Sequence, residues 1–118
     1  MEINSKAVPV FQWQDCLHYF GDATEAKEVL SEFKTQVLAE RPTLIKAVDQ
    51  QDVWRARFLL EKLTCTAKYC GLPKLYQTLL KVEDQLTAYD SSPKLLQSLL
   101  ENNIQESVSA IEAFLNNY

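Results

Sequence analysis

The stretch from Asp52 to Leu72, DVWRARFLLEKLTCTAKYCGL, has the apolar spacing of a helix that lies against a protein core. Residues separated by alternating steps of three and four share one face of an α-helix. The apolar residues with this spacing are Val53, Ala56, Leu60, Leu63, Ala67 and Cys70. Gly71 follows the last of them and closes the pattern. The stretch therefore predicts one long central helix that ends at Gly71.

Two further helices are predicted before this stretch. A short one runs from about Phe11 to Phe20 and ends at Gly21. The next begins at Asp22 or Thr24, both of which are good cap residues. Its predicted buried side consists of Val29, Phe33, Val37 and Leu38.

Pro42 falls inside the second of these patterns. Proline lacks the backbone N–H that a helix interior needs, so we expect a kink or a break after Glu40. The helix is then expected to resume from Leu44 to Val48, and residues 50–52 to form the turn into the central helix.

Two more helices are predicted after Gly71. Pro73 suits the first turn of one of them, and Ser92 with Pro93 suits the start of the other. The stripe of the first is Leu75, Leu79, Val82 and Leu86. The last helix carries Leu95, Leu96, Leu99, Leu100, Ile104, Val108, Ile111 and Leu115.

The composition favours an all-α fold. The 118 residues include two glycines and four prolines, too few for the turns of a strand-rich fold, and 47% are hydrophobic. Four long amphipathic helices joined by short turns predict an antiparallel four-helix bundle with a short N-terminal helix. We expect residues 1–9 to be a flexible leader and residues 10–118 to form one domain.

Charge and cysteine content exclude several functions. A net charge of −4 and a pI near 5.0 give no basic surface for nucleic acid or for a membrane. Neither a membrane-spanning run nor a signal peptide is evident, so a cytoplasmic location is expected. Cys16, Cys65 and Cys70 lack the spacing of a metal site or a disulfide framework, so neither a metal nor a cofactor is predicted. On the central helix, Cys70 should face the core and Cys65 the solvent.

A second face of the central helix is unusually organised. Glu61, Thr64, Cys65 and Lys68 lie at i, i+3, i+4 and i+7, and Lys62 lies beside them. The segment from Leu60 to Gly71, L-E-K-L-T-C-T-A-K-Y-C-G, resembles the central motif of the histidine-containing phosphotransfer (HPt) family, A-H-x-L-K-G-x-A-x-x-x-G. The buried positions of the motif match at Leu60, Leu63, Ala67 and Gly71.

The resemblance covers about three quarters of the chain. The residues that extend it are Trp13, Leu17, Phe20-Gly21-Asp22, Val29-Leu30, Phe33, Leu44, Ala47 to Asp52, Leu75, Leu79 and Glu83-Asp84. The resemblance implies a four-helix bundle, with a response-regulator receiver domain or a histidine kinase as partner.

The chemical positions of the motif differ from the family. Glu61 stands in place of the phospho-accepting histidine, Thr64 in place of the lysine and Cys65 in place of the glycine. A carboxylate cannot form the phosphoramidate that histidine forms, and an acyl phosphate would need magnesium and neutralising groups. Glu61 is therefore either a solvated surface glutamate or a fixed negative charge that partly mimics phosphohistidine. His18, the single histidine, lacks the motif around it and is a weak candidate acceptor.

Aromatic residues occupy the side of the central helix opposite its buried stripe. Trp54 and Phe58 lie there with Cys65, and Tyr69 lies at the edge. Two interpretations fit: either the N-terminal helix covers part of this strip through Phe11 and Trp13, or the strip binds a partner protein or a second copy.

The sequence thus predicts a non-enzymatic HPt-like interaction module that acts as an adaptor or antagonist in phosphorelay signalling. One alternative is a structural or self-associating helical protein with no phosphorelay role. A second alternative is an active phosphotransfer protein that uses His18.

Overall fold

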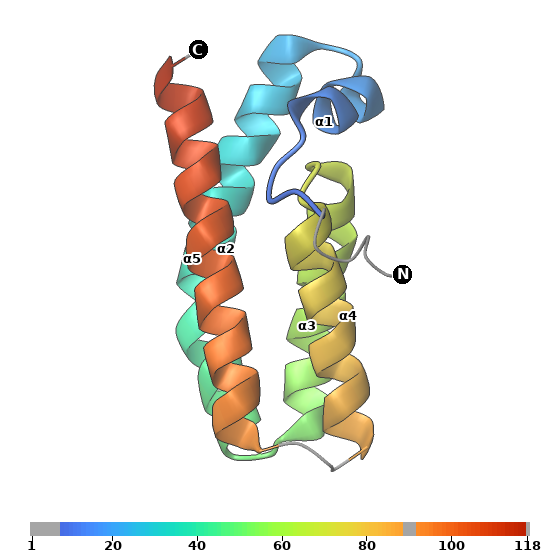
Figure 1. The fold of residues 1–118 in the computed structure, drawn as a ribbon, viewed down its shortest axis with the longest axis vertical. Helices are drawn as coiled ribbons and strands as arrows, with labels where there is room; N and C mark the ends of the chain where they lie inside the picture. The colour runs from blue at the N-terminus through green and yellow to red at the C-terminus, as the bar shows by residue number, and fades with distance from the viewer. Residues whose placement is uncertain (1–7, 89–91, 118) are drawn as a thin grey trace.

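A computed structural model describes residues 8–88 and 92–117, and the described part of the chain is all-helical, without a strand (Figure 1). A short helix precedes four long ones. The bounds are α1 (Trp13–Phe20), α2 (Ala23–Asp49), α3 (Val53–Tyr69), α4 (Pro73–Ala88) and α5 (Pro93–Asn117). The predicted all-α class is therefore confirmed.

The long helices contact one another in a closed order. α2 packs against α3 and α5, and α4 packs against the same two helices. In Figure 1 each long helix runs opposite in direction to the one before it, and α1 lies at the end of the molecule where α2 begins and α3 ends. α1 contacts both of these helices.

The interior is built from the apolar stripes of the long helices. In α3, Ala56, Leu60, Leu63 and Ala67 are fully buried, as predicted, and Cys70 just beyond the helix is buried too. Leu59, which the predicted stripe omitted, is also buried, while Val53 is only half-buried. The largest fully buried side chains include Phe33, Leu30, Leu44, Leu75, Leu79, Leu100, Ile104 and Ile111.

Two features of α2 differ from those expected. Of the kink or break expected after Glu40, the break does not occur, because the helix runs through Pro42. Apolar residues on both sides of the proline, such as Val37 and Leu44, are buried in the same core, and that burial opposes an interruption. Leu38 is exposed rather than buried, because the inward-facing positions of this turn are taken by Phe33 and Val37.

Side chains cap the helices where the sequence indicates. Asp22, and not Thr24, accepts a hydrogen bond from the Glu25 amide at 2.9 Å and so begins α2. Asp52, expected only as part of the turn before the central helix, also accepts from the Arg55 amide at 3.2 Å at the start of α3. Ser92 accepts from the Lys94 amide at 3.2 Å at the start of α5.

The segment before α1 is attached to the turn between α3 and α4. The Gln12 amide donates to the Gly71 carbonyl at 2.8 Å, and the Lys74 amide donates to the Pro9 carbonyl at 3.2 Å. A Cβ atom on Gly71 would overlap the Gln12 carbonyl oxygen, so this close approach needs glycine. Pro9 is the last residue of the predicted leader, and residues 1–7 lie outside the described residues.

Candidate interaction surface

Glu61 lies near the middle of α3 with 60% of its side chain exposed. Its carboxylate forms an ion pair with Arg57, one turn earlier, at 3.7 Å. Arg57 also reaches Glu83 on α4 at 3.4 Å. The Glu61 carboxylate therefore faces solvent, and a single guanidinium is shared between two carboxylates.

The side chains around Glu61 are either engaged within the protein or exposed to solvent. The Thr64 hydroxyl donates to the Leu60 carbonyl at 2.6 Å, so it is used within its own helix. Lys62 pairs with Glu40 of α2 at 2.8 Å. Cys65 and Lys68 are exposed. None of these four side chains is an imidazole.

His18 is exposed on α1, a different element from the Glu61 face. The residue after it, Tyr19, stacks on Tyr69 of α3 with ring centroids 4.0 Å apart. Tyr69 is therefore partly covered by α1, and the aromatic surface at this end of α3 is formed by both rings.

The other end of the aromatic strip is open. Trp54 is 85% exposed and Phe58 is 64% exposed. The predicted cover by Phe11 and Trp13 is wrong, because both rings pack on Phe114 of α5, with centroids 5.2 and 4.5 Å away. The first turns of α3 therefore present large apolar side chains to solvent.

The strip borders a groove between α2 and α3. Its lining residues are Thr43, Trp54, Arg55, Phe58 and Leu59. A second hollow adjoins the groove and shares Thr43 and Arg55 with it; its other lining residues are Pro42, Lys46, Ala47, Gln50 and Asp52. Sequence reasoning missed the α2 contribution, because helical spacing ranks positions within one helix and does not pair two helices.

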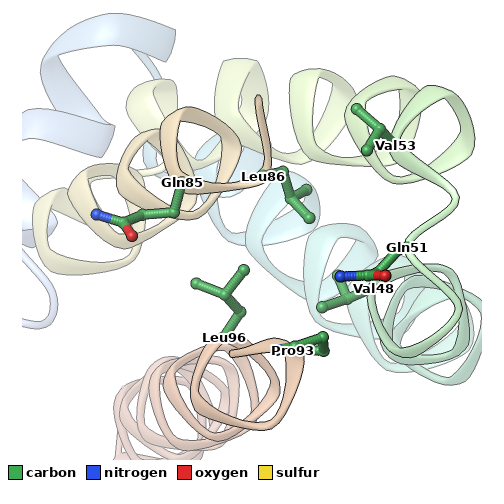
Figure 2. Close-up of a pocket in the computed structure, with 7 residues that line it drawn as sticks. All are labelled: Val48, Gln51, Val53, Gln85, Leu86, Pro93 and Leu96. Atoms are coloured by element: carbon green, nitrogen blue, oxygen red, sulfur yellow. The ribbon is translucent and has the colours of Figure 1, made fainter. Parts of the chain in front are cut away.

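A small recess lies at the end of the molecule where α2 meets α3 and α4 meets α5 (Figure 2). Figure 2 shows that side chains from all four long helices and from the α2–α3 turn line it. The lining residues are Val48, Gln51, Val53, Gln85, Leu86, Pro93 and Leu96. Among the described residues that line this recess, none is charged and none is a predicted site residue.

The thiols of the two buried cysteines have raised pKa values. Burial raises the pKa of the Cys16 thiol to about 11. Burial, and next to it the neighbouring Cys16, raises the pKa of the Cys70 thiol to about 12. The described residues contain no group of His, Cys, Asp and Glu side chains that could hold a metal ion. Among the helices described, none has the length and apolar character to cross a membrane.

No protein-family model, curated protein or solved structure matches this chain. The exposed side of α3, which carries Glu61, Trp54 and Phe58, is therefore the candidate interaction surface.

Proposed function

We propose that the protein is a non-catalytic HPt-like module that binds a receiver domain or a histidine kinase without carrying phosphate, as an adaptor or antagonist. The observation that carries this proposal is the position of Glu61. The motif aligned on Gly71 puts Glu61 at the phospho-acceptor site, and its carboxylate is exposed to solvent. A buried carboxylate there would have removed the basis for a signalling role.

The arrangement of the helices supports the same proposal. We interpret α2–α5 as an antiparallel four-helix bundle of the HPt type, with α1 across one end. The residues that match the family have structural roles consistent with this interpretation. Gly21 ends α1 in the left-handed conformation, Asp22 caps α2, and Gly71 admits the segment before α1.

The side chains present support binding without phosphate. Phosphotransfer through an HPt-like site needs an exposed imidazole, and Glu61 has no nucleophilic nitrogen. Its fixed charge stands in part for phosphohistidine, while Trp54 and Phe58 supply apolar area for contact.

Binding to purified receiver domains and histidine kinases tests the proposal, with wild type compared to Glu61→Ala and Glu61→His. Glu101→Ala is a matched control, because Glu101 is an exposed helix glutamate on α5. We expect Glu61→Ala to weaken binding and Glu101→Ala to leave it unchanged. Equal binding by wild type and both Glu61 variants would contradict a role for the carboxylate.

Phosphate transfer is measured in the same system. A phosphorylated receiver should pass no acid-labile label to the wild-type chain. Label that appears on the wild type and disappears in His18→Ala would instead support the active phosphotransfer alternative.

The exposure of Trp54 also favours a second candidate, a structural protein that associates with itself through the aromatic strip. Size-exclusion chromatography with light scattering separates the two functions. A dimer that Trp54→Ser converts to a monomer would support self-association, and a monomeric wild type would exclude it.

A further inference from the structure

The groove beside Trp54 combines an apolar half with a cationic half. Trp54, Phe58 and Leu59 form the apolar half. The adjoining hollow brings Lys46 next to Arg55, which belongs to both halves. A ligand that lies along α2 and α3 would therefore contact the aromatic rings with one part and the positive charges with the adjacent part.

The charge of α3 is opposite to that of the chain. Between Val53 and Tyr69 there are four cations, Arg55, Arg57, Lys62 and Lys68, against Glu61 alone, so the helix carries +3. The whole chain carries −4, which leaves −7 on the remaining residues, with eight cations and fifteen carboxylates. α3 is thus a basic helix on an acidic protein, and three of its four cations pair with carboxylates: Arg55 with Asp52, Arg57 with Glu61 and Glu83, and Lys62 with Glu40.

The carboxylates near the groove are already occupied. Asp52 accepts the Arg55 amide at 3.2 Å and lies 3.6 Å from the Arg55 side chain. Glu40 is paired with Lys62 at 2.8 Å. Lys46 is exposed and forms no ion pair with the part of the chain that the structure describes. Lys46 and Arg55 thus outnumber Asp52 among the charged residues that line the two hollows, and Lys46 is left to pair with a ligand.

We infer that this groove binds an acidic amphipathic helix of a partner protein. A helix suits the space between two packed helices, and it presents apolar anchors at i, i+3 or i+4, and i+7. Such anchors cover Trp54 and Phe58, while flanking carboxylates reach Lys46 and Arg55. The inference rests on the proposed role of the α3 face in binding a protein, and it adds the chemistry of the partner.

A second copy of the chain fits the groove less well. A two-fold interface places the same patch against itself, so the basic face of one α3 would meet the basic face of the other. Like charges brought together in an interface cost binding energy. An acidic helix gains from the same charges.

Two synthetic peptides test the inference on the full chain. Each is about 18 residues, or roughly five helical turns, with leucines in identical positions; one has glutamate at its polar positions and the other has lysine. Binding is followed by titration calorimetry at low and at physiological salt. We expect the glutamate peptide to bind at least about tenfold more tightly than the lysine peptide, with the difference shrinking as salt rises.

Variants locate the site. Trp54→Ser and Phe58→Ser should each weaken the glutamate peptide about tenfold or more, as anchor residues do, and Lys46→Glu should weaken it too. Leu80→Ser and Leu95→Ser are matched controls, because they remove leucines that are 43% and 56% exposed on α4 and α5. Far-UV circular dichroism checks that every variant keeps its helical content.

Three results would overturn the inference: neither peptide binds, both bind equally, or light scattering shows a dimer that Trp54→Ser dissociates. Receiver and kinase binding is measured in parallel to separate this inference from the proposed function. Receiver binding without peptide binding would overturn only the inference that the groove binds an acidic helix. Peptide binding without receiver or kinase binding would support that inference and contradict the proposal that the partner belongs to a phosphorelay.

Discussion

Replacing Gly71 by alanine should destabilise the protein more than the same replacement at Gly21. The two glycines have nearly the same left-handed backbone, with φ of 73° and 77°. The backbone strain of alanine is therefore similar at both positions, about 1 kcal/mol. The effect on the entropy of the unfolded chain is also similar. The difference between the two changes in unfolding free energy therefore reports the surroundings of the added methyl group.

Those surroundings differ sharply. Nothing lies within 4 Å of a Cβ on Gly21, whereas a Cβ on Gly71 overlaps the Gln12 carbonyl oxygen. Relief of the overlap moves the segment before α1. That movement costs the Gln12–Gly71 hydrogen bond, about 1 kcal/mol, and part of the ring contacts on Phe114, about 1 kcal/mol. We expect about 1 kcal/mol for Gly21→Ala and about 3 kcal/mol for Gly71→Ala.

Urea unfolding followed by far-UV circular dichroism gives the free energy of unfolding of each variant. A Trp54→Phe background leaves Trp13 as the only tryptophan, so its fluorescence reports the attachment of α1 to α5. Gly71→Ala should change this signal in the native state and Gly21→Ala should not. Equal destabilisation by the two variants would refute the proposed close packing of Gly71 against residue 12.

Three further predictions concern the thiols and the proline. At pH 8, iodoacetamide should label only Cys65 in the native protein, because Cys16 and Cys70 are buried; rapid labelling of all three would contradict their burial. The folded pKa values of about 11 and 12 exceed the ordinary value of 9.0, so the stability they contribute is complete below pH 9 and lost as pH rises toward 11 and 12. The free energy of unfolding should fall in that range, and less steeply in a Cys16→Ala, Cys70→Ala double variant. Pro42→Ala should raise the free energy of unfolding by about 1–3 kcal/mol, as measured by urea titration. An unchanged or lower value would show that Pro42 does not destabilise the helix.

Periodicity within one helix predicted most of the core. Ala56, Leu60, Leu63 and Ala67 could be placed inside because the three-to-four spacing reports the side of a helix that leaves water. The cap residues Asp22 and Ser92 could be predicted as well, since their side chains act on amides only two or three residues away. Interactions within a single helix were therefore sufficient to predict its buried side and its cap.

Contacts between helices could not be predicted in this way. Nothing in the sequence near Trp13 indicates that its ring lies on Phe114, about one hundred residues later. The contribution of Thr43 to the groove beside Trp54 is likewise a matter of how α2 and α3 pair. The continuity of α2 through Pro42 has the same origin, because burial on both sides outweighs the local penalty of proline.

The Glu61 ion pair bears on how a partner would bind. Arg57 and Glu61 are both largely exposed, and such a pair contributes about 0–1 kcal/mol. A partner that offers its own cation to Glu61 therefore loses little by displacing Arg57, which keeps Glu83 as a second partner. An exposed carboxylate gives selectivity and encounter rate more than affinity. Most of the affinity must then come from apolar area, which Trp54 and Phe58 provide on the same helix. Glu61 would decide which partner binds, and the aromatic strip how tightly.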